Sequence, residues 1–471
     1  MTDTAQMPVT IRLKVKALVG NKVAQGIVGT MLLKVASAVV AFALFSLAAR
    51  SAGVKEFGYF SIIFSAVSML SIIAAAGQEL QIVRSWNEYL SADRPAFAVG
   101  ALRFGWVVTI TGALIGSVLL WAVFEPGLVL ADIPLANQWT LSAAAVAFLA
   151  TNTLSLYSAH ATRAIVGIRW GDAHYELTWR SIAILFLAWC LWMGRPVYSS
   201  EIFAVFAIGL ILVVVTQVWA VARRVRVEVG TPEPRYNLRE WSGRSFRLWL
   251  AVTMEAANQH MEVFLIGMLL DPIAAGAYFV ASRLANAFAL ATGGLYTFAT
   301  RRIPRLYFSR DIPALKHTLH LMAITTFLIV VGGMSVVLLA GDYMLMVFGS
   351  SYADYYWVLV ILSIGTAVTA ANGAAPSFLM LTGHEGRYMV VVTASVILRV
   401  VGFFLVVPSH GIIGAAVVTA AIMVAMALLL NVYCRIFTGM DPSIIRFFIE
   451  SPDTPPASFK PADATAERLE K

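Results

Sequence analysis

The chain has 471 residues, of which 59% are hydrophobic and only 13% are charged, with a mean hydropathy of +0.79. Soluble domains are about 45–50% apolar and about 25% charged, so this composition excludes an ordinary soluble protein. The net charge of +8 does not indicate a nucleic-acid-binding surface, because the cations lie between long apolar runs and no soluble domain carries them.

Long apolar runs recur along the chain, and crossing the hydrocarbon of a bilayer as a helix takes roughly 20 residues. No cleavable signal peptide is evident before the first run, so we read it as a retained span. We expect twelve spans, near residues 27–49, 57–77, 101–124, 139–160, 177–194, 201–222, 248–270, 273–299, 318–340, 356–382, 387–408 and 411–434.

The basic residues predict how these spans are oriented. With the N-terminus in the cytoplasm, 27 of the 34 Lys and Arg residues fall in cytoplasmic segments and four fall within spans. The other three, Arg50, Lys55 and Arg195, fall on the opposite side. This strong positive-inside bias predicts an even number of spans and two cytoplasmic termini.

The same pattern predicts five regions. The loop between spans six and seven carries seven arginines and divides the spans into two sets of six. The polar, Pro-rich end of the chain has the composition of a disordered tail. The basic N-terminal segment either lies on the membrane surface or is a disordered positive tail. The regions are 1–26 (basic, cytoplasmic), 27–222 (first lobe), 223–247 (cytoplasmic linker), 248–434 (second lobe) and 435–471 (cytoplasmic tail).

Two stretches at corresponding places in these halves resemble each other: EFGYFSIIFSAVSML from residue 56 and AAGAYFVASRLANAF from residue 274. Aligning Gly58 with Gly276 places Arg84 opposite Arg302, each at the cytoplasmic end of its span. Because each half has an even number of spans, the halves have the same orientation. The sequence therefore predicts a parallel repeat with the substrate site between the two halves.

The passage LAARSAGVKEFGYFSIIFSAVSMLSIIAAAGQELQIVRSW resembles the polysaccharide-transporter branch of the multidrug/oligosaccharidyl-lipid/polysaccharide (MOP) flippase superfamily. Members have a small-residue turn, an acidic residue followed by Phe-Gly, and a helix that ends in Val-Arg. The passage LLDPIAAGAYFVASRLANAF…ATRRIPRLY resembles the same family's second-half counterpart, including the proline after the span 8 arginines. The resemblance covers residues 31–433, although the lipid II branch of the superfamily usually has fourteen spans.

This resemblance implies two six-helix lobes that form a V around a central cavity. It also implies alternating-access flipping of a polyprenyl-pyrophosphate-linked oligosaccharide, an O-antigen or exopolysaccharide repeat unit, across the bacterial inner membrane. No cofactor is implied. The partners implied are the lipid-linked glycan, the bilayer, and a polysaccharide polymerase or export machinery.

Four cations fall inside the predicted spans. Arg283 lies ten residues from the external end of its span and Arg399 about twelve residues into its own, so neither is expected to reach a headgroup layer. Each should face protein or a wet cavity. Lys34 and Arg180 lie near the cytoplasmic interface, and for Arg180 simple snorkelling to that interface is the plainer interpretation.

Two carboxylates fall inside span seven, where Glu255 and Glu262 share one helix face. Glu262 could pair with Arg283 and brace the hairpin of spans seven and eight. Alternatively, the four cations form a substrate-binding cavity for pyrophosphate, and the two acids balance their charge or carry a proton. The surplus of cations over acids favours an anionic substrate over a cationic drug.

Other features are weaker candidates. Gly373 and Pro376 in span ten invite a kink and a hinge, because proline removes a backbone donor. Asp172, His174 and Glu176 are interpreted as a solvated cytoplasmic rim. No residues with metal-ligand spacing stand out.

The sequence predicts a transporter and not an enzyme. The phosphate-loop pattern G-x-x-x-x-G-K-[ST] and the H-E-x-x-H and G-x-S-x-G motifs are absent. A membrane glycosyltransferase or polysaccharide polymerase remains the enzymatic alternative, although the external loops are short, the longest being near 125–138. A multidrug or other lipid exporter of the same superfamily is the second alternative.

Overall fold

The computed structural model describes residues 22–124, 135–230, 232–287, 311–381 and 384–448, and single positions at 292, 293, 303, 306 and 309. Every regular element in these ranges is a helix. Most of the predicted N-terminal segment, the loop at 125–134, Arg302 and the tail after residue 448 lie outside the described residues.

The first half of the chain contains seven α-helices and one π-helical turn within the ranges described. A reversal at Ala76 (φ 54°) and Gly77 (φ 71°) ends α3 and begins α4. The elements are α2 (Lys22–Ala52), α3 (Val54–Ala74), α4 (Gln78–Ser91), α5 (Pro95–Phe124), α6 (Leu135–Ile165), η1 (Arg169–Ala173), α7 (His174–Trp192) and α8 (Ser199–Glu228).

The second half begins with α9. In α15 the chain departs from helical geometry at Gly411 (φ 58°, ψ −151°), between the predicted spans 387–408 and 411–434. Val418 packs against Gly402, so these two segments lie side by side. The elements are α9 (Leu238–Leu269), α10 (Pro272–Ala285), α12 (Ile312–Met346), η2 (Ser350–Tyr355), α13 (Tyr356–Ala371), α14 (Ala375–Leu381), α15 (Glu385–Thr438) and η3 (Ile444–Phe447).

Eight of the described stretches are long and apolar enough to cross a membrane, and one of them contains the last two predicted spans. The predicted spans at 177–194, 248–270 and 273–299 are not among the eight. The helices at these positions, α7, α9 and α10, line internal cavities with polar side chains, as shown below. The chain is a multi-pass membrane protein, and the predicted all-α polytopic class is confirmed.

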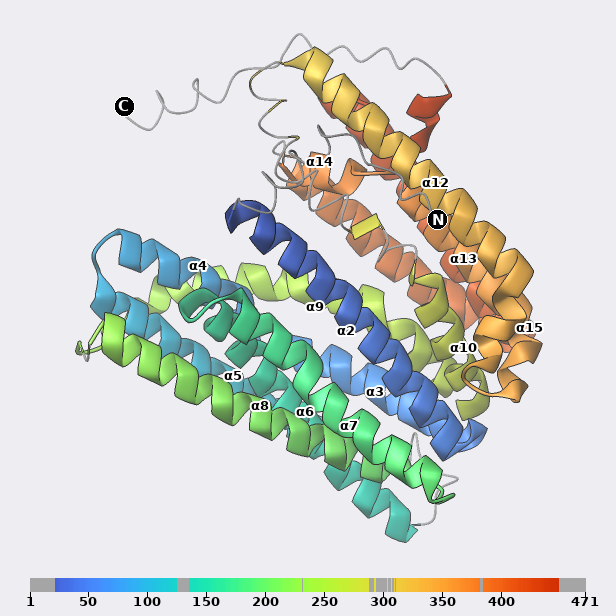
Figure 1. Ribbon diagram of the computed structural model, residues 1–471, viewed down its shortest axis with the longest axis horizontal. Coiled ribbons are helices and arrows are strands. Elements are labelled where there is room, and N and C mark those ends of the chain that lie inside the picture. The colour runs from blue at the N-terminus through green and yellow to red at the C-terminus, as the bar shows by residue number, and fades with distance from the viewer. Residues whose placement is uncertain are drawn as a thin grey trace, which may run out of the picture.

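The helices form two arms that meet at one end of the molecule and separate toward the other (Figure 1). One arm contains α4 to α8 and the other contains α12 to α15, with α2, α3, α9 and α10 between them. We call the joined end the closed end. There the Ser46 hydroxyl and the Arg50 Nε donate to the Val347 carbonyl at 2.8 and 2.7 Å.

Two glycines allow the halves to meet at the closed end. A Cβ on Gly58 would lie 2.0 Å from the carbonyl oxygen of Pro272, and one on Gly276 would lie 3.1 Å from the Gly58 Cα. Only residues without a side chain permit this backbone approach. The two positions that the sequence repeat aligns are therefore in contact in the fold.

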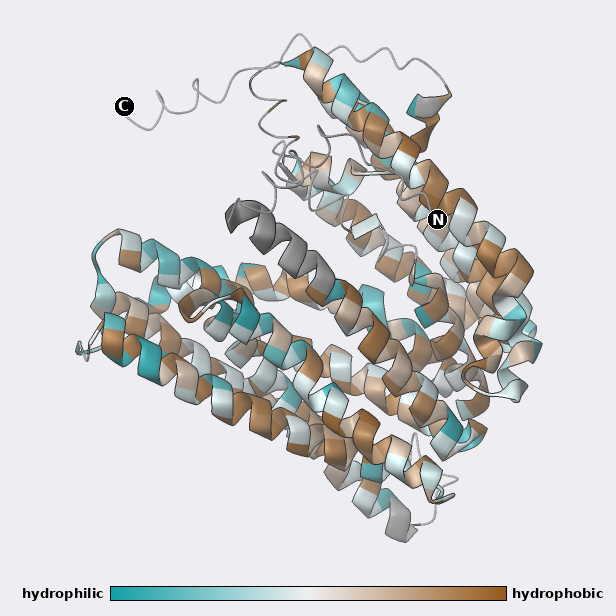
Figure 2. Cartoon of the chain, in the orientation of Figure 1, coloured by the Kyte–Doolittle hydropathy of each residue, from teal (hydrophilic) through white to brown (hydrophobic). Residues whose placement is uncertain are grey.

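Hydrophobic residues cover the outer faces of helices such as α8 and α12 (Figure 2). On α8 the exposed residues include Ile208, Ile211, Val215 and Trp219. So much apolar surface on the outside fits contact with lipid tails and not with water.

The predicted linker 223–247 is mostly helical, because α8 continues to Glu228 and α9 begins at Leu238. Its central part is docked on the first half, since the Arg235 amide donates to the Ala96 carbonyl at 3.0 Å. The predicted tail also starts later than residue 435. Asp441 accepts hydrogen bonds from Asn431 and Ser443, and the η3 turn follows.

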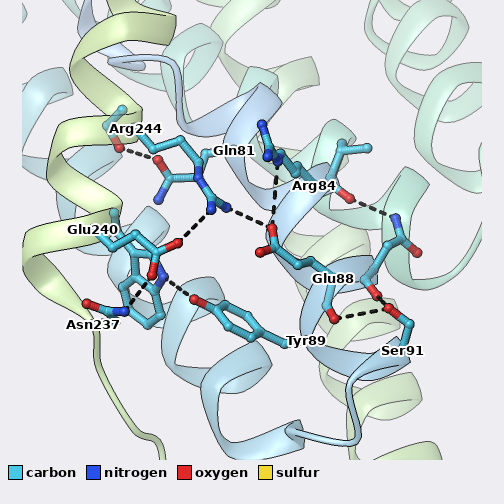
Figure 3. Close-up of polar contacts among 12 residues, drawn as sticks. Gln81, Arg84, Glu88, Tyr89, Ser91, Asn237, Glu240 and Arg244 are labelled. Carbon is cyan, nitrogen blue, oxygen red and sulfur yellow. Dashed lines mark hydrogen bonds and ion pairs between the residues drawn. The ribbon is translucent and has the colours of Figure 1, made fainter. Parts of the chain in front are cut away.

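The N-terminal part of α9 packs against α4 of the first half. Trp241 Nε1 donates to the Tyr89 hydroxyl at 2.8 Å, and Arg244 bonds to Glu88 at 2.9 Å and to Glu240 at 2.7 Å (Figure 3). The C-terminal part of α9 packs against α3, α10 and α15. One continuous helix therefore contacts both halves of the molecule.

Candidate functional site

A cavity of about 730 Å³ lies between the two halves of the chain. Helices α2, α3, α6 and α7 line one side of it, and α9, α10 and α12 line the other. A second cavity of about 330 Å³ lies among α9, α10, α13 and α15. Gln259, Arg283 and Asn286 line both cavities, so these residues separate two adjoining spaces.

The aromatic side chains of Phe45, Phe64, Phe148 and Phe348 form part of the larger cavity's wall. Phe45, Phe64 and Phe148 belong to a continuous cluster of packed rings; the Phe45 and Phe64 centroids, for example, are 5.3 Å apart. This cluster gives the cavity an apolar wall next to its charged residues.

The first half contributes a four-residue polar cluster to the larger cavity. Glu176 accepts a hydrogen bond from Ser37 at 2.6 Å, forms an ion pair with Arg180 and lies 3.4 Å from the Lys34 Nζ. Arg180 also donates to the Ser37 hydroxyl at 2.8 Å. One carboxylate therefore balances two cations, and the Lys34 side chain is 57% exposed.

The second half contributes a buried ion pair to the smaller cavity. Arg399 donates to Glu262 at 2.7 Å and to the Asn258 side-chain oxygen at 3.1 Å. The other oxygen of Glu262 accepts from the Tyr278 hydroxyl at 2.6 Å, and that hydroxyl lies 2.8 Å from the Thr419 Oγ1. The Arg399 side chain is 5% exposed and the Glu262 side chain 16% exposed, so the cation is the more deeply buried partner of a charge-balanced pair.

Arg283 lies between the two clusters and has no hydrogen bond or ion pair with any residue that the structure describes. Its guanidinium lies 4.7 Å from the Phe279 ring centroid and 5.8 Å from that of Phe45. Its Nε is buried without an acceptor. Cation–π contacts offset part of the cost of desolvating the charge but leave its hydrogen-bonding capacity unused. The guanidinium is thus available to an anionic ligand.

The predicted site residues are therefore only partly brought together. Lys34, Arg180 and Arg283 line the same cavity, whereas Arg399 lines the adjoining one and is neutralised by Glu262. The alternative brace between Glu262 and Arg283 is wrong, because Glu262 bonds to Arg399 and Tyr278 instead.

Glu255 lies away from both ion clusters. It is exposed and accepts a hydrogen bond from Gln259 at 2.7 Å. Gln259 in turn lines both cavities, so Glu255 acts on the site at most through this neighbour.

Glu176 is a cavity residue that the sequence did not identify as one. The interpretation of a solvated rim is wrong for this residue, since its side chain is 17% exposed and has three polar partners. Asp172 also departs from that interpretation, as it is 6% exposed and pairs with Arg163 at 2.5 Å. The i, i+4 spacing of Glu176 and Arg180 was the signal that could have revealed their pairing.

The predicted kink in span ten is a full break in the helix. Gly373 has φ +66°, α13 ends at Ala371, and α14 begins at Ala375, one residue before Pro376. The Pro442 carbonyl oxygen lies 2.0 Å from where a Cβ of Gly373 would be, so the chain after α15 packs into the break. Whether the break acts as a hinge remains a prediction. In the ranges described, no group of His, Cys, Asp and Glu is placed to hold a metal ion.

Solved structures with the same fold as this chain were found among known proteins. An inward-facing multidrug resistance MATE family transporter of the MOP superfamily superposes with a TM-score of 0.70 over 86% of this chain and 97% of that chain, at 11% identity. The lipid II flippase MurJ, in an inward closed conformation, superposes with a TM-score of 0.66 over 86% and 87%, at 13% identity.

An outward-facing MATE family transporter of the MOP superfamily reaches a TM-score of 0.58 over 86% of this chain and 93% of that chain, at 12% identity. No protein-family model matches the chain, and no curated protein matches it by sequence. The chain therefore has the fold of these MATE transporter and MurJ structures. At these sequence identities, the shared fold does not show which substrate this chain binds.

Proposed function

We propose that this protein is a flippase for a polyprenyl-pyrophosphate-linked oligosaccharide, such as an O-antigen or exopolysaccharide repeat unit. The observation that carries the proposal is Arg283, a deeply placed guanidinium that borders both cavities and has no acidic partner among the described residues. A planar guanidinium fork suits phosphate oxygens, and its charge in an apolar setting favours a dianionic group.

Lys34 and Arg180 extend this site toward the first half of the chain. Together with Arg283 they place three cations around the larger cavity, while Glu176 supplies one carboxylate. A pyrophosphate entering here would compete with Glu176 for Lys34, whose separation from the carboxylate is already 3.4 Å. The aromatic wall is suited to the apolar part of such a substrate.

We further propose that the closed end faces the cell exterior. Arg50 and Lys55 lie at this end, and Arg195 bonds to Glu201 at the start of α8, close to the Ser199–Glu56 contact. These are the three cations that the charge count assigns to the external side. In this orientation the arms separate toward the cytoplasm of a bacterial inner membrane, where both chain ends would lie and where lipid-linked glycans would enter.

A second candidate is export of cationic drugs, which the multidrug MATE neighbours raise. The charge of the larger cavity weighs against it, because an organic cation would meet three cations and one acid. A membrane enzyme acting on lipid-linked sugar is the third candidate. The large external catalytic loop expected of such enzymes has no counterpart in the short external loops of this sequence.

The test compares cells that lack the gene with cells complemented by variants, measuring on which leaflet the lipid-linked glycan accumulates. Arg283→Ala should remove the phosphate contact, leaving the full-length glycan on the cytoplasmic leaflet while protein levels stay near normal. Arg283→Lys should restore part of the export, because a point charge replaces the fork. Arg223→Ala, at an exposed arginine stacked on Trp219 outside the cavity, serves as the control and should export normally.

Three results would contradict the proposal. Normal export by Arg283→Ala would show that this guanidinium does not bind the substrate. A shorter or unpolymerised glycan that is already external in the deletion strain would establish the enzymatic alternative. Normal glycan export in the deletion strain, combined with increased sensitivity to cationic drugs, would establish the multidrug alternative.

A further inference from the structure

A third hollow lies outside the central cavities, in the first half of the chain, where the C-terminal end of α8 is followed by the linker. It has a volume of about 300 Å³ and is bordered by α5, α6 and α8, with Gly230 and Pro232 of the linker as a further wall. The linker is held in place here, because the Arg235 amide donates to Ala96 and the Arg235 carbonyl oxygen lies against Gly100. The hollow is therefore a built feature of the fold.

Three polar residues line this hollow without an ion-pair or hydrogen-bond partner for their side chains among the described residues. Arg103 and Arg226 line it, and neither has a carboxylate partner among the described residues. Arg224, two positions from Arg226, is by contrast paired with Glu228. Ser158 is also among the residues that line the hollow; it is 1% exposed, and its hydroxyl has no hydrogen-bond partner in the described structure. Buried hydroxyls are nearly always bonded, so the Ser158 hydroxyl has a hydrogen bond to offer.

The remaining walls are apolar and continue onto the lipid-facing surface. Trp106, Val218 and Val221 line the hollow. One turn along α8 from Val218 and Trp219, Val215 is 60% exposed, as is Trp219 itself, and the Arg223 guanidinium lies 5.6 Å from the Trp219 ring centroid. Tryptophan next to arginine at a helix end is typical of the membrane–water boundary. The hollow thus opens at headgroup depth.

We propose that this hollow binds the phosphate headgroup of an anionic phospholipid. Arg103 and Arg226 would hold the phosphate, Ser158 would donate a hydrogen bond from within the hollow, and an acyl chain would lie along the exposed apolar face of α8. The apolar walls and their continuity with the lipid-facing surface favour a lipid over free phosphate. Basic pockets at this depth between transmembrane helices suit anionic headgroups.

The test uses the full chain in nanodiscs of phosphatidylcholine with or without phosphatidylglycerol. Native mass spectrometry of protein released from the discs counts retained phosphatidylglycerol, and the melting temperature reports stabilisation by binding. Arg103→Gln/Arg226→Gln should lower the affinity for phosphatidylglycerol on the order of tenfold and remove the rise in melting temperature. The matched control, Arg223→Gln/Arg224→Gln, removes two charges at the same helix end but should keep the retained lipid.

A second variant tests the space and not the charge. Ala222→Trp, at an exposed position that lines the hollow, should exclude the headgroup while both arginines remain. If the control and Arg103→Gln/Arg226→Gln lost equal amounts of retained phosphatidylglycerol, the lipid would be held by unspecific surface attraction. That result would contradict a specific site. Displacement of the lipid by inorganic phosphate at constant ionic strength would show a site for free anions and overturn the lipid assignment. Full retention in Ala222→Trp would overturn the location.

Discussion

The two halves of the molecule carry ion clusters of similar composition in different settings. In the first half, Glu176 is shared by Lys34 and Arg180 and faces the larger cavity. In the second half, Glu262 and Arg399 form a one-to-one pair that Tyr278 closes off. The first cluster has excess positive charge and an exposed member, whereas the second is neutral and buried.

This difference teaches that an intramembrane charge is informative only together with its partners. In a buried pair the carboxylate already neutralises the cation, and removing either partner is costly because it leaves a buried charge uncompensated. A cluster with more cations than acids can exchange its carboxylate for an incoming phosphate. Arg283, which has no acidic partner among the described residues, is the extreme case of a cation whose charge is not balanced by a carboxylate.

Breaking the buried pair should give the largest effect. Arg399→Met strands the Glu262 carboxylate and should lower the free energy of unfolding by about 3–5 kcal/mol. The double variant Arg399→Met/Glu262→Leu should recover most of that loss, because no charge is left unpaired. Thermal unfolding and folded yield in detergent measure both. The matched change Arg180→Met should cost only about 1–2 kcal/mol, since Glu176 keeps Lys34 and Ser37. Equal costs for the two single variants would remove the distinction between the clusters.

The glycine contact between the halves should give an effect of intermediate size. Gly58→Ala drives a methyl group against the Pro272 carbonyl and should cost about 1–3 kcal/mol, selectively in the state whose closed end is joined. Gly276→Ala, where the gap is 3.1 Å, is the milder counterpart. Spin labels at Lys55 and Tyr343, both exposed, would report the separation of the two halves. An unchanged distance distribution in Gly58→Ala would show that this contact does not bias the state.

Replacing Glu176, the only acid in the first-half cluster, should give the smallest effect on stability. It should still change substrate binding measurably. Glu176→Gln leaves Lys34 and Arg180 without a counter-charge, so a pyrophosphate lipid should bind more tightly by about 1 kcal/mol, or roughly fivefold. Turnover should fall because release becomes slower. Binding and flipping assays in proteoliposomes separate the two quantities. Weaker binding in Glu176→Gln would show that the acid positions the cations for the substrate instead of competing with it.

The sequence was sufficient to predict the architecture. Apolar runs and the charge count gave an all-helical membrane protein of two halves, and the aligned glycines Gly58 and Gly276 meet in the fold. Depth along a span also singled out Arg283 as a residue that must face protein or a cavity, and it lines both cavities. Hydropathy and depth are local properties, which a single sequence contains.

Pairing between different helices could not be predicted, because it depends on how the helices rotate against one another. Arg283 and Arg399 lie at similar depths, yet α9 presents Glu262 to α15 and to Tyr278 rather than to Arg283. Glu176 was missed for a related reason. Its position just outside the predicted span 177–194 suggested solvent, whereas α7 begins at His174 and α2 supplies Ser37 and Lys34 as partners.

The docking of α9 on both halves sets a mechanical condition on any rearrangement of the arms. Between Gly243 and Gly267 this helix contains neither glycine nor proline, so it has no residue that localises a sharp bend. This composition favours a sliding contact of α9 over a sharp bend within that part of the helix. If α9 shifts along α3 and α4 as the arms approach, the hydrogen bonds of Trp241 to Tyr89 and of Arg244 to Glu88 would have to exchange for others. The resistance to such a shift would then come partly from side chains outside the two central cavities, at the contact shown in Figure 3.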